Sequence, residues 1–106
     1  MRHFVCMKFE PGFFSPAVFE EIAAAFAALR EALPEEILAC TVHKNVVERE
    51  QNMDLMIEME LKDAGSLEKY LPHPLHRDIG KRMDPHIVKI ASFDCDQTPY
   101  LSSTMH

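Results

Sequence analysis

Residues Leu67–His76 read Leu-Glu-Lys-Tyr-Leu-Pro-His-Pro-Leu-His and carry the densest set of structural signals in this 106-residue chain. Upstream, Asp63 suits the N-cap of a short helix, because its carboxylate can accept a hydrogen bond from a free backbone N–H. Pro72 ends that helix, since the residue before a proline avoids helical conformation. Pro74 fits the first turn of a second helix, where a missing N–H costs nothing. The stretch therefore predicts two short helices separated by a break that is rich in titratable side chains.

The chain on either side of this break alternates between strand and helix patterns. A long amphipathic helix is predicted from the N-cap Ser15, with Pro16 in its first turn, to Pro34, which ends it. Apolar runs and alternating patterns predict strands at residues 3–9, 37–44, 54–61 and 86–96. The resulting order is β-α-β-β-α-(α)-β, which is the ferredoxin-like split βαβ arrangement. We therefore expect an α+β fold with a four-stranded antiparallel sheet and its helices on one face.

The other face of such a sheet needs a cover. Residues 3–9 are largely apolar in both alternating sets, which predicts a strand that is covered on both sides. Glu58 and Glu60 alternate with apolar residues and are expected to face solvent or an interface. Two sheets packed face to face would cover the bare surface, so we expect a homodimer.

Composition limits the possible partners and the compartment. The length fits a single domain, and the formal net charge of −6 argues against nucleic acid and anionic membranes, since Lys81 and Arg82 are too isolated to form a basic patch. Cys6, Cys40 and Cys95 lie in apolar strand patterns without a Cys-x-x-Cys pair, so we expect buried, reduced thiols. No signal peptide or membrane span is predicted, and the expected location is the cytoplasm.

The motif Tyr70-x-x-His73-Pro74-x-His76, behind an Asp-led strand, resembles the Dabb family of stress-responsive dimeric α/β-barrel proteins. The opening strand, His3-Phe4-Val5-Cys6-Met7-Lys8-Phe9, is similar to the first strand of that family. The resemblance runs over most of residues 3–96. It implies one Dabb domain at residues 1–96, two sheets pairing into a dimeric α/β barrel, and a C-terminal tail at residues 97–106.

The resemblance also implies roles for the polar residues. The family includes plant polyketide cyclases that perform an intramolecular aldol closure, and their phenol donor and general base correspond to Tyr70 and His76. His3 and His73 match two further family histidines and are expected to contact a ligand. Pro72 departs from the family pattern and could rotate His73 away from Tyr70. Structural roles are the alternative for each residue, with His73 capping the following helix.

The chemistry of these side chains fits the same picture. A tyrosine hydroxyl stays protonated near neutral pH and can donate to a developing oxyanion, while a neutral imidazole can take a proton. Together they suit proton abstraction next to a carbonyl group, with no organic cofactor or metal. His73-x-x-His76 has no third ligand nearby in sequence, so no metal site is predicted. Leu67, Leu71 and Leu75 are expected to supply apolar walls for a pocket shared by Tyr70 and His76.

Three functions remain open from the sequence. The first is a small dimeric Dabb-type protein of unassigned activity that binds a small hydrophobic, oxygenated ligand near Tyr70 and His76. The second is a cofactor-independent cyclase, isomerase or lyase that uses the same two residues. The third is a cofactor-independent monooxygenase, which the absence of Trp makes less favoured. Whether the protein is an enzyme is not decided by the sequence.

Overall fold

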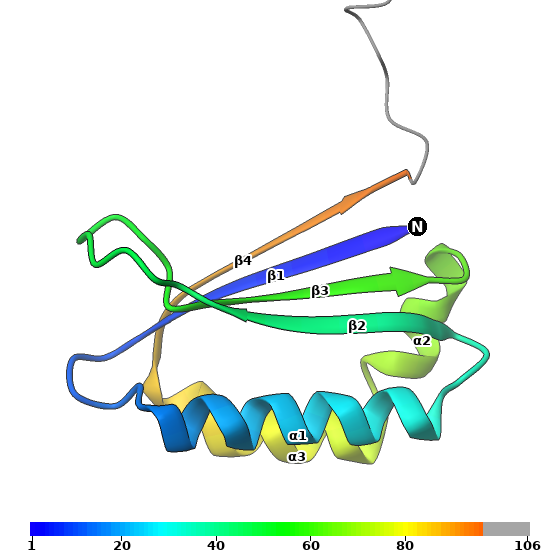
Figure 1. Cartoon of the computed structure of the whole chain (residues 1–106). Helices are drawn as coiled ribbons and strands as arrows, with labels where there is room; N and C mark the ends of the chain where they lie inside the picture. The colour runs from blue at the N-terminus through cyan, green and yellow to red at the C-terminus, as the bar shows by residue number, and fades with distance from the viewer. Residues whose placement is uncertain (97–106) are drawn as a thin grey trace, which may run out of the picture.

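The sheet has four antiparallel strands in the order β2-β3-β1-β4. The computed structural model describes residues 1–96, so the tail predicted at 97–106 lies outside the described residues. The strands are β1 (Arg2–Phe9), β2 (Ile37–Lys44), β3 (Leu55–Leu61) and β4 (Ile87–Cys95). The helices are α1 (Pro16–Ala32), α2 (Leu67–Tyr70) and α3 (Pro74–Met83), with short 3₁₀ turns at Ala64–Ser66 and Asp84–His86. Figure 1 shows α1 and α3 together on one side of the sheet. The predicted α+β, ferredoxin-like fold is confirmed.

Helix α1 begins and ends where its sequence signals lie. The Ser15 hydroxyl accepts a hydrogen bond from the Val18 backbone N–H at 3.2 Å, which satisfies one of the free donors of the first turn. The rings of Phe14 and Phe19 meet edge to face across this start, with centroids 6.4 Å apart, as a hydrophobic staple would. Pro34 follows the C-cap Leu33 and prevents the helix from continuing.

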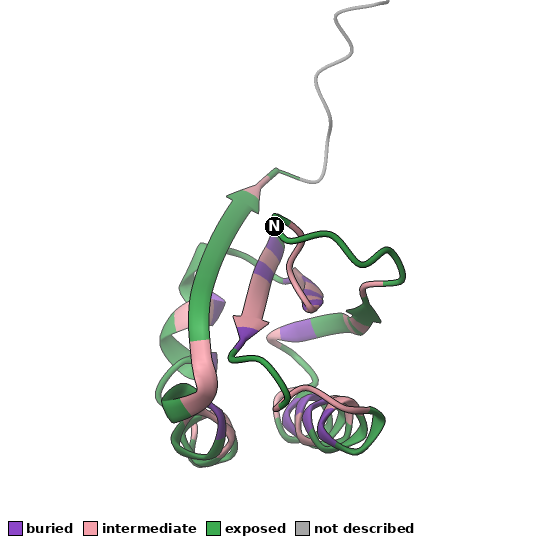
Figure 2. Cartoon of the chain, turned by 90° about the vertical axis from the view of Figure 1, so that its left-hand side faces the viewer, coloured by how far each residue is buried: buried purple, intermediate pink, exposed green. Residues whose placement is uncertain are grey.

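The core lies between the sheet and the helices. Alternate residues of β3 are buried without exception, and the buried face of α1 packs towards them (Leu55, Ile57, Met59, Leu61; Val18, Ile22, Phe26, Leu29). Burying each large apolar side chain contributes about 1.5–3 kcal/mol to stability. The same apolar residues that predicted these elements therefore stabilise their packing. In Figure 2 the buried residues lie on the inner faces of the helices and on the strands, while β4 is almost entirely exposed.

The helix-free face of the sheet carries an apolar and a charged part. Phe93 is 65% exposed there, and its ring lies 6.5 Å from that of Phe4 on β1. Glu58 forms ion pairs with His43 and with Arg2, and the hydrogen bond from His43, followed by that from Arg2, lowers the pKa of the Glu58 carboxyl. Within one protomer β1 is therefore covered by helices on one side only, and Glu58 faces outward as expected.

The prediction for the cysteines is only partly correct. Cys6, Cys40 and Cys95 are free thiols, but each is partly exposed in the protomer rather than buried. They lie on β1, β2 and β4, and the last two are edge strands of the sheet. No described helix is long and apolar enough to span a membrane.

Candidate functional site

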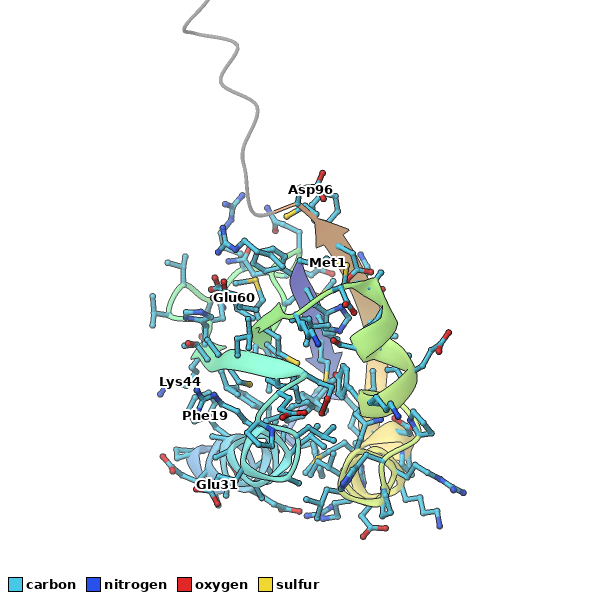
Figure 3. All side chains as sticks on the ribbon, turned by 90° about the vertical axis from the view of Figure 1, so that its right-hand side faces the viewer. Met1, Phe19, Glu31, Lys44, Glu60 and Asp96 are labelled. Carbon is cyan, nitrogen blue, oxygen red and sulfur yellow. The ribbon has the colours of Figure 1, made fainter. Side chains whose placement is uncertain are left out.

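The edge of the sheet formed by β1 and β4 is separated from the helices by a cavity of about 630 Å³. Its walls come from β1, β4 and all three helices. In Figure 3, α2 (green) and α3 (yellow) lie one above the other on the side of the molecule that carries β4 (orange). Most of the lining is apolar, contributed largely by Val5, Ile22, Phe26, Leu67, Leu71, Ile79, Met83, Ile87 and Ile90. A largely apolar concave site with a few polar groups is the usual form of a small-molecule site.

Tyr70 is the last residue of α2 and lines this cavity. Its side chain is among the most buried in the protein, with 1% of its surface exposed. Burial, helped by the nearby Cys40 thiol and Asp94 carboxylate, raises the pKa of the Tyr70 phenol well above its usual range. The phenol therefore keeps its proton across the physiological range and can serve as a hydrogen-bond donor.

His76, in the first turn of α3, meets Tyr70 edge to face with ring centroids 4.8 Å apart. Its Nδ1 lies 2.9 Å from the backbone oxygen of Leu71. Since a carbonyl can only accept, Nδ1–H is the donor, and in the neutral ring Nε2 is left with a lone pair. This carbonyl is available because the two helices break at Pro72, which lacks an N–H and interrupts the helical ladder. The local sequence thus fixes both the orientation and the tautomer of His76.

His3 forms the third polar group of the cavity. It is 5% exposed, and its ring meets that of Tyr70 edge to face at 5.5 Å. It lies directly opposite Asp94 on the neighbouring strand β4, and its Nδ1 contacts the Asp94 carboxylate. The other ring nitrogen, Nε2, is buried and has no hydrogen-bond partner among residues 1–96. A buried, unpaired imidazole nitrogen is costly, so this atom is a candidate contact for a ligand.

The five predicted site residues other than Tyr70 and His76 can now be placed. His3, Leu67 and Leu71 line the cavity together with Tyr70 and His76. His73 and Leu75, the third predicted apolar wall, do not line it. The His73 Nδ1 accepts a hydrogen bond from the Leu75 N–H at 3.1 Å, so the His73 side chain caps α3 instead.

Sequence reasoning missed Asp94, Arg77 and Lys81 of α3, and the α3 C-cap Asp84, all of which line the cavity. Asp94 alternates in phase with Ile90 and Ser92, two other lining residues, so strand periodicity carries a signal. Recognising it requires the β1–β4 register, which the sequence does not display. Among residues 1–96 no group of three or more His, Cys, Asp or Glu is placed to hold a metal ion.

Comparison with known proteins places this chain in a family. The sequence profile of the Stress responsive A/B Barrel Domain family matches residues 1–97. The chain belongs to this family. No curated protein sequence matches it.

Several solved structures share the fold of this chain at low sequence identity. An Arabidopsis thaliana protein superimposes with a TM-score of 0.76 at 20% identity, covering 94% of this chain and 97% of that one. A hydroxynitrile lyase from Passiflora edulis gives 0.72 at 16% identity, covering 93% and 95%. A dimeric ferredoxin-like protein of unknown function from Thermobifida fusca gives 0.71 at 20% identity, covering 87% and 85%. These structures share the architecture with this chain, and its activity has to be argued from the cavity.

Proposed function

We propose that this Dabb protein binds a small hydrophobic, oxygenated molecule in the cavity beside β4. The observation that carries the proposal is the meeting of Tyr70, His76 and His3 on one mostly apolar cavity. The ligand's oxygen would accept a hydrogen bond from the Tyr70 hydroxyl, which has no partner of its own among residues 1–96. The apolar part of the ligand would pack on Leu67 and Leu71.

A cofactor-independent enzyme is the second candidate, and the tautomer of His76 favours it. Its Nδ1–H is held by Leu71, so Nε2 is the nitrogen that could take a proton from the carbon next to a carbonyl group. The pair of electrons released by that C–H bond would move to the carbonyl oxygen, where the Tyr70 hydroxyl would donate to the developing charge. The enolate would then undergo aldol closure, isomerisation or elimination, according to the substrate. The Passiflora edulis neighbour, named as a lyase, shows that the fold can carry an enzyme.

A neutral ketone tests the binding proposal. Titration of the isotope-labelled protein with methyl heptyl ketone, followed by NMR, should shift resonances of Tyr70, His76 and His3. The variant His76→Ala should bind several-fold more weakly, because it removes one cavity wall. The matched control is His73→Ala, which removes an imidazole three residues away and outside the cavity, and should leave ketone affinity unchanged. Absence of any shift at the cavity, or equal weakening by both variants, would contradict the proposal.

The enzyme candidate has its own readout, which needs no knowledge of the natural substrate. In deuterated buffer the wild type should accelerate exchange of the ketone's protons next to the carbonyl, measured by proton NMR. Removing a general base typically costs about 10²–10⁴-fold in rate, so His76→Ala should return exchange close to the uncatalysed rate. If the wild type binds the ketone but does not accelerate proton exchange, the binding function stands and the enzyme candidate is refuted.

We also propose that the helix-free face pairs with a second copy to form a homodimer. The support is the exposed Phe93, half-covered Phe4, and the neighbouring structures that are described as dimeric. Such an interface would bury more than about 1,000 Å² in total. Sedimentation should show a dimer at micromolar concentration, and Phe93→Asp should dissociate it. Val46→Asp is the matched control, because Val46 is 85% exposed on the loop between β2 and β3. A monomeric wild type would refute the dimer.

We propose that the protein is located in the cytoplasm. Its support is the three unpaired cysteines, since a reducing compartment keeps thiols free.

A further inference from the structure

Helix α3 presents a second group of residues to the cavity beyond His76. Arg77, Gly80, Lys81 and Asp84 all line it, at relative positions i, i+3, i+4 and i+7. This spacing places them on one stripe of a helix and its C-cap. The stripe is separate from the Tyr70 end, because α-helical rise puts Lys81 about 7–8 Å along the axis from His76.

The charges on this stripe are unusual for the chain. The formal net charge is −6, so most basic side chains have acidic neighbours available. Arg82 pairs with Glu21, and Arg2 pairs with Glu58. Arg77 and Lys81, by contrast, have no ion pair and no side-chain hydrogen bond within residues 1–96.

Two acidic groups share the cavity and must be counted against these cations. Asp94 is engaged by His3 across the β1–β4 pair. Asp84 lies at the C-terminal end of the stripe and has no basic partner among the described residues. With His3 neutral, the four ionised side chains on the wall (Arg77, Lys81, Asp84 and Asp94) sum to zero. The wall is therefore locally neutral in a protein of net charge −6, and Arg77 and Lys81 are two cations on it without an ion pair among residues 1–96.

Gly80 supplies an independent observation. It lies in the interior of α3, where glycine is less favourable than alanine. A Cβ built at this position would meet only the Asp84 carboxylate, at 3.8 Å, which is an ordinary contact. Packing within the chain therefore does not require glycine here. Glycine leaves this position of the cavity lining, next to Lys81, without a side chain.

We propose that the ligand is amphipathic and carries an anionic head group, a carboxylate or a phosphate monoester, which Arg77 and Lys81 hold at the α3 wall of the cavity. Its carbonyl end reaches Tyr70 and His76, and its apolar middle spans the wall between them. Guanidinium groups bind both kinds of anion through parallel hydrogen bonds, and the ammonium adds a point charge. This inference rests on the proposed use of the cavity as a ligand site, and it narrows the ligand from an oxygenated hydrophobe to an oxygenated amphiphile.

Three ligands of equal chain length test the inference. They are methyl heptyl ketone and its two derivatives in which the far methyl group is replaced by a carboxylate or by a phosphate monoester. The wild type should bind at least one anionic ligand roughly ten-fold more tightly than the neutral ketone. The advantage should shrink as salt is raised, because exposed charges are screened. Whichever anion binds more tightly identifies the head group.

Variants assign the effect to residues. Arg77→Gln and Lys81→Gln should each reduce the ratio of anion affinity to ketone affinity, and the double variant should bring this ratio to about one. Lys69→Gln is the matched control, because it removes the same charge from neighbouring helix α2 at a residue outside the cavity wall. Gly80→Ala should raise the thermal unfolding midpoint, because alanine favours a helix interior more than glycine does. It should also weaken anion binding, because the new methyl group lies in the cavity lining next to Lys81.

The outcomes separate this inference from the proposed function. If neither the ketone nor the anions bind, the cavity is not a ligand site and both proposals fail. If the ketone binds but no anion binds better, or if the advantage survives loss of Arg77 and Lys81, the anionic subsite is refuted and the ligand site stands.

Discussion

Tyr70→Phe is the most informative single substitution, because it changes one oxygen atom at the centre of the site. The Tyr70 ring touches His3, Phe26 and His76, with centroid distances of 5.5, 6.5 and 4.8 Å. Phenylalanine keeps all three contacts. The hydroxyl, by contrast, has no hydrogen-bond partner within residues 1–96, although only 1% of the residue's surface is exposed.

The size of the effect on stability follows from that missing partner. Deleting a buried hydroxyl that makes a hydrogen bond usually costs about 1 kcal/mol. A hydroxyl without a hydrogen-bond partner carries a desolvation penalty of about 1–3 kcal/mol when it is fully buried. The penalty is smaller here, because Tyr70 lines a cavity that water can enter. Tyr70→Phe should therefore leave the free energy of unfolding unchanged or raise it by up to about 1 kcal/mol. For a domain of this size that corresponds to a midpoint shift between zero and roughly +4 to +8 °C.

Ligand binding should move in the opposite direction. Loss of one neutral hydrogen bond costs about 0.5–1.5 kcal/mol, so affinity for methyl heptyl ketone should fall roughly 2- to 13-fold. Unfolding in urea and heat must be compared at one protein concentration, because a dimer's stability depends on it. A variant destabilised by more than about 1 kcal/mol, with ketone affinity intact, would show that the hydroxyl is a structural group and refute the reasoning.

The fold was predictable because its signals are local. The hydroxyl of Ser15, the ring of Pro16 and the alternating apolar residues of β3 each act over a few positions, and each acts in the structure as expected. Pro74 opens α3 as its fixed backbone angle requires. Chain order then leaves few topologies for one sheet with right-handed connections.

The site was predictable only where its residues lie close in sequence. Tyr70 and His76 flank one break, so the sequence displays their proximity. For His73 the sequence left two roles open, ligand contact and helix capping, because spacing does not reveal the direction of a side chain. The extended backbone of His73 (φ −61°, ψ 137°) turns the imidazole onto the Leu75 N–H. Asp94 is separated from His3 by 91 positions, and only the strand register brings the two together.

The charges of α3 show a further limit of sequence reasoning. Lys81 and Arg82 are adjacent in the chain and looked like an isolated basic pair. Successive residues of a helix are rotated by about 100° from each other, so two adjacent charges can have different surroundings. Arg82 reaches Glu21 on α1, whereas Lys81 lines the cavity with Arg77. The surroundings of each charged side chain therefore depend on the rotation of α3 about its axis, which the sequence pattern did not determine.

Three further substitutions test how the surrounding frame is held. Asp63→Ala should lower the free energy of unfolding, measured in urea, by about 1 kcal/mol, because the Asp63 carboxylate accepts a hydrogen bond from the Ser66 N–H at 3.2 Å. Asp63→Asn should keep most of the wild-type stability, because its amide oxygen can accept the same hydrogen bond. Gly12→Ala should also destabilise by about 1 kcal/mol, since Gly12 has φ +83° and alanine resists that conformation. Cys40→Ala should alter the pH dependence of stability: burial raises the pKa of the Cys40 thiol from 9.0 to about 11, with Arg30 acting in the opposite sense. Above a pH of about 9 the unfolded chain therefore binds fewer protons than the folded one, and wild-type stability must fall as pH rises towards 11. The variant lacks this thiol, so its urea midpoint should fall less between about pH 8 and about pH 10.5; identical slopes in the two proteins would show that Cys40 is not responsible.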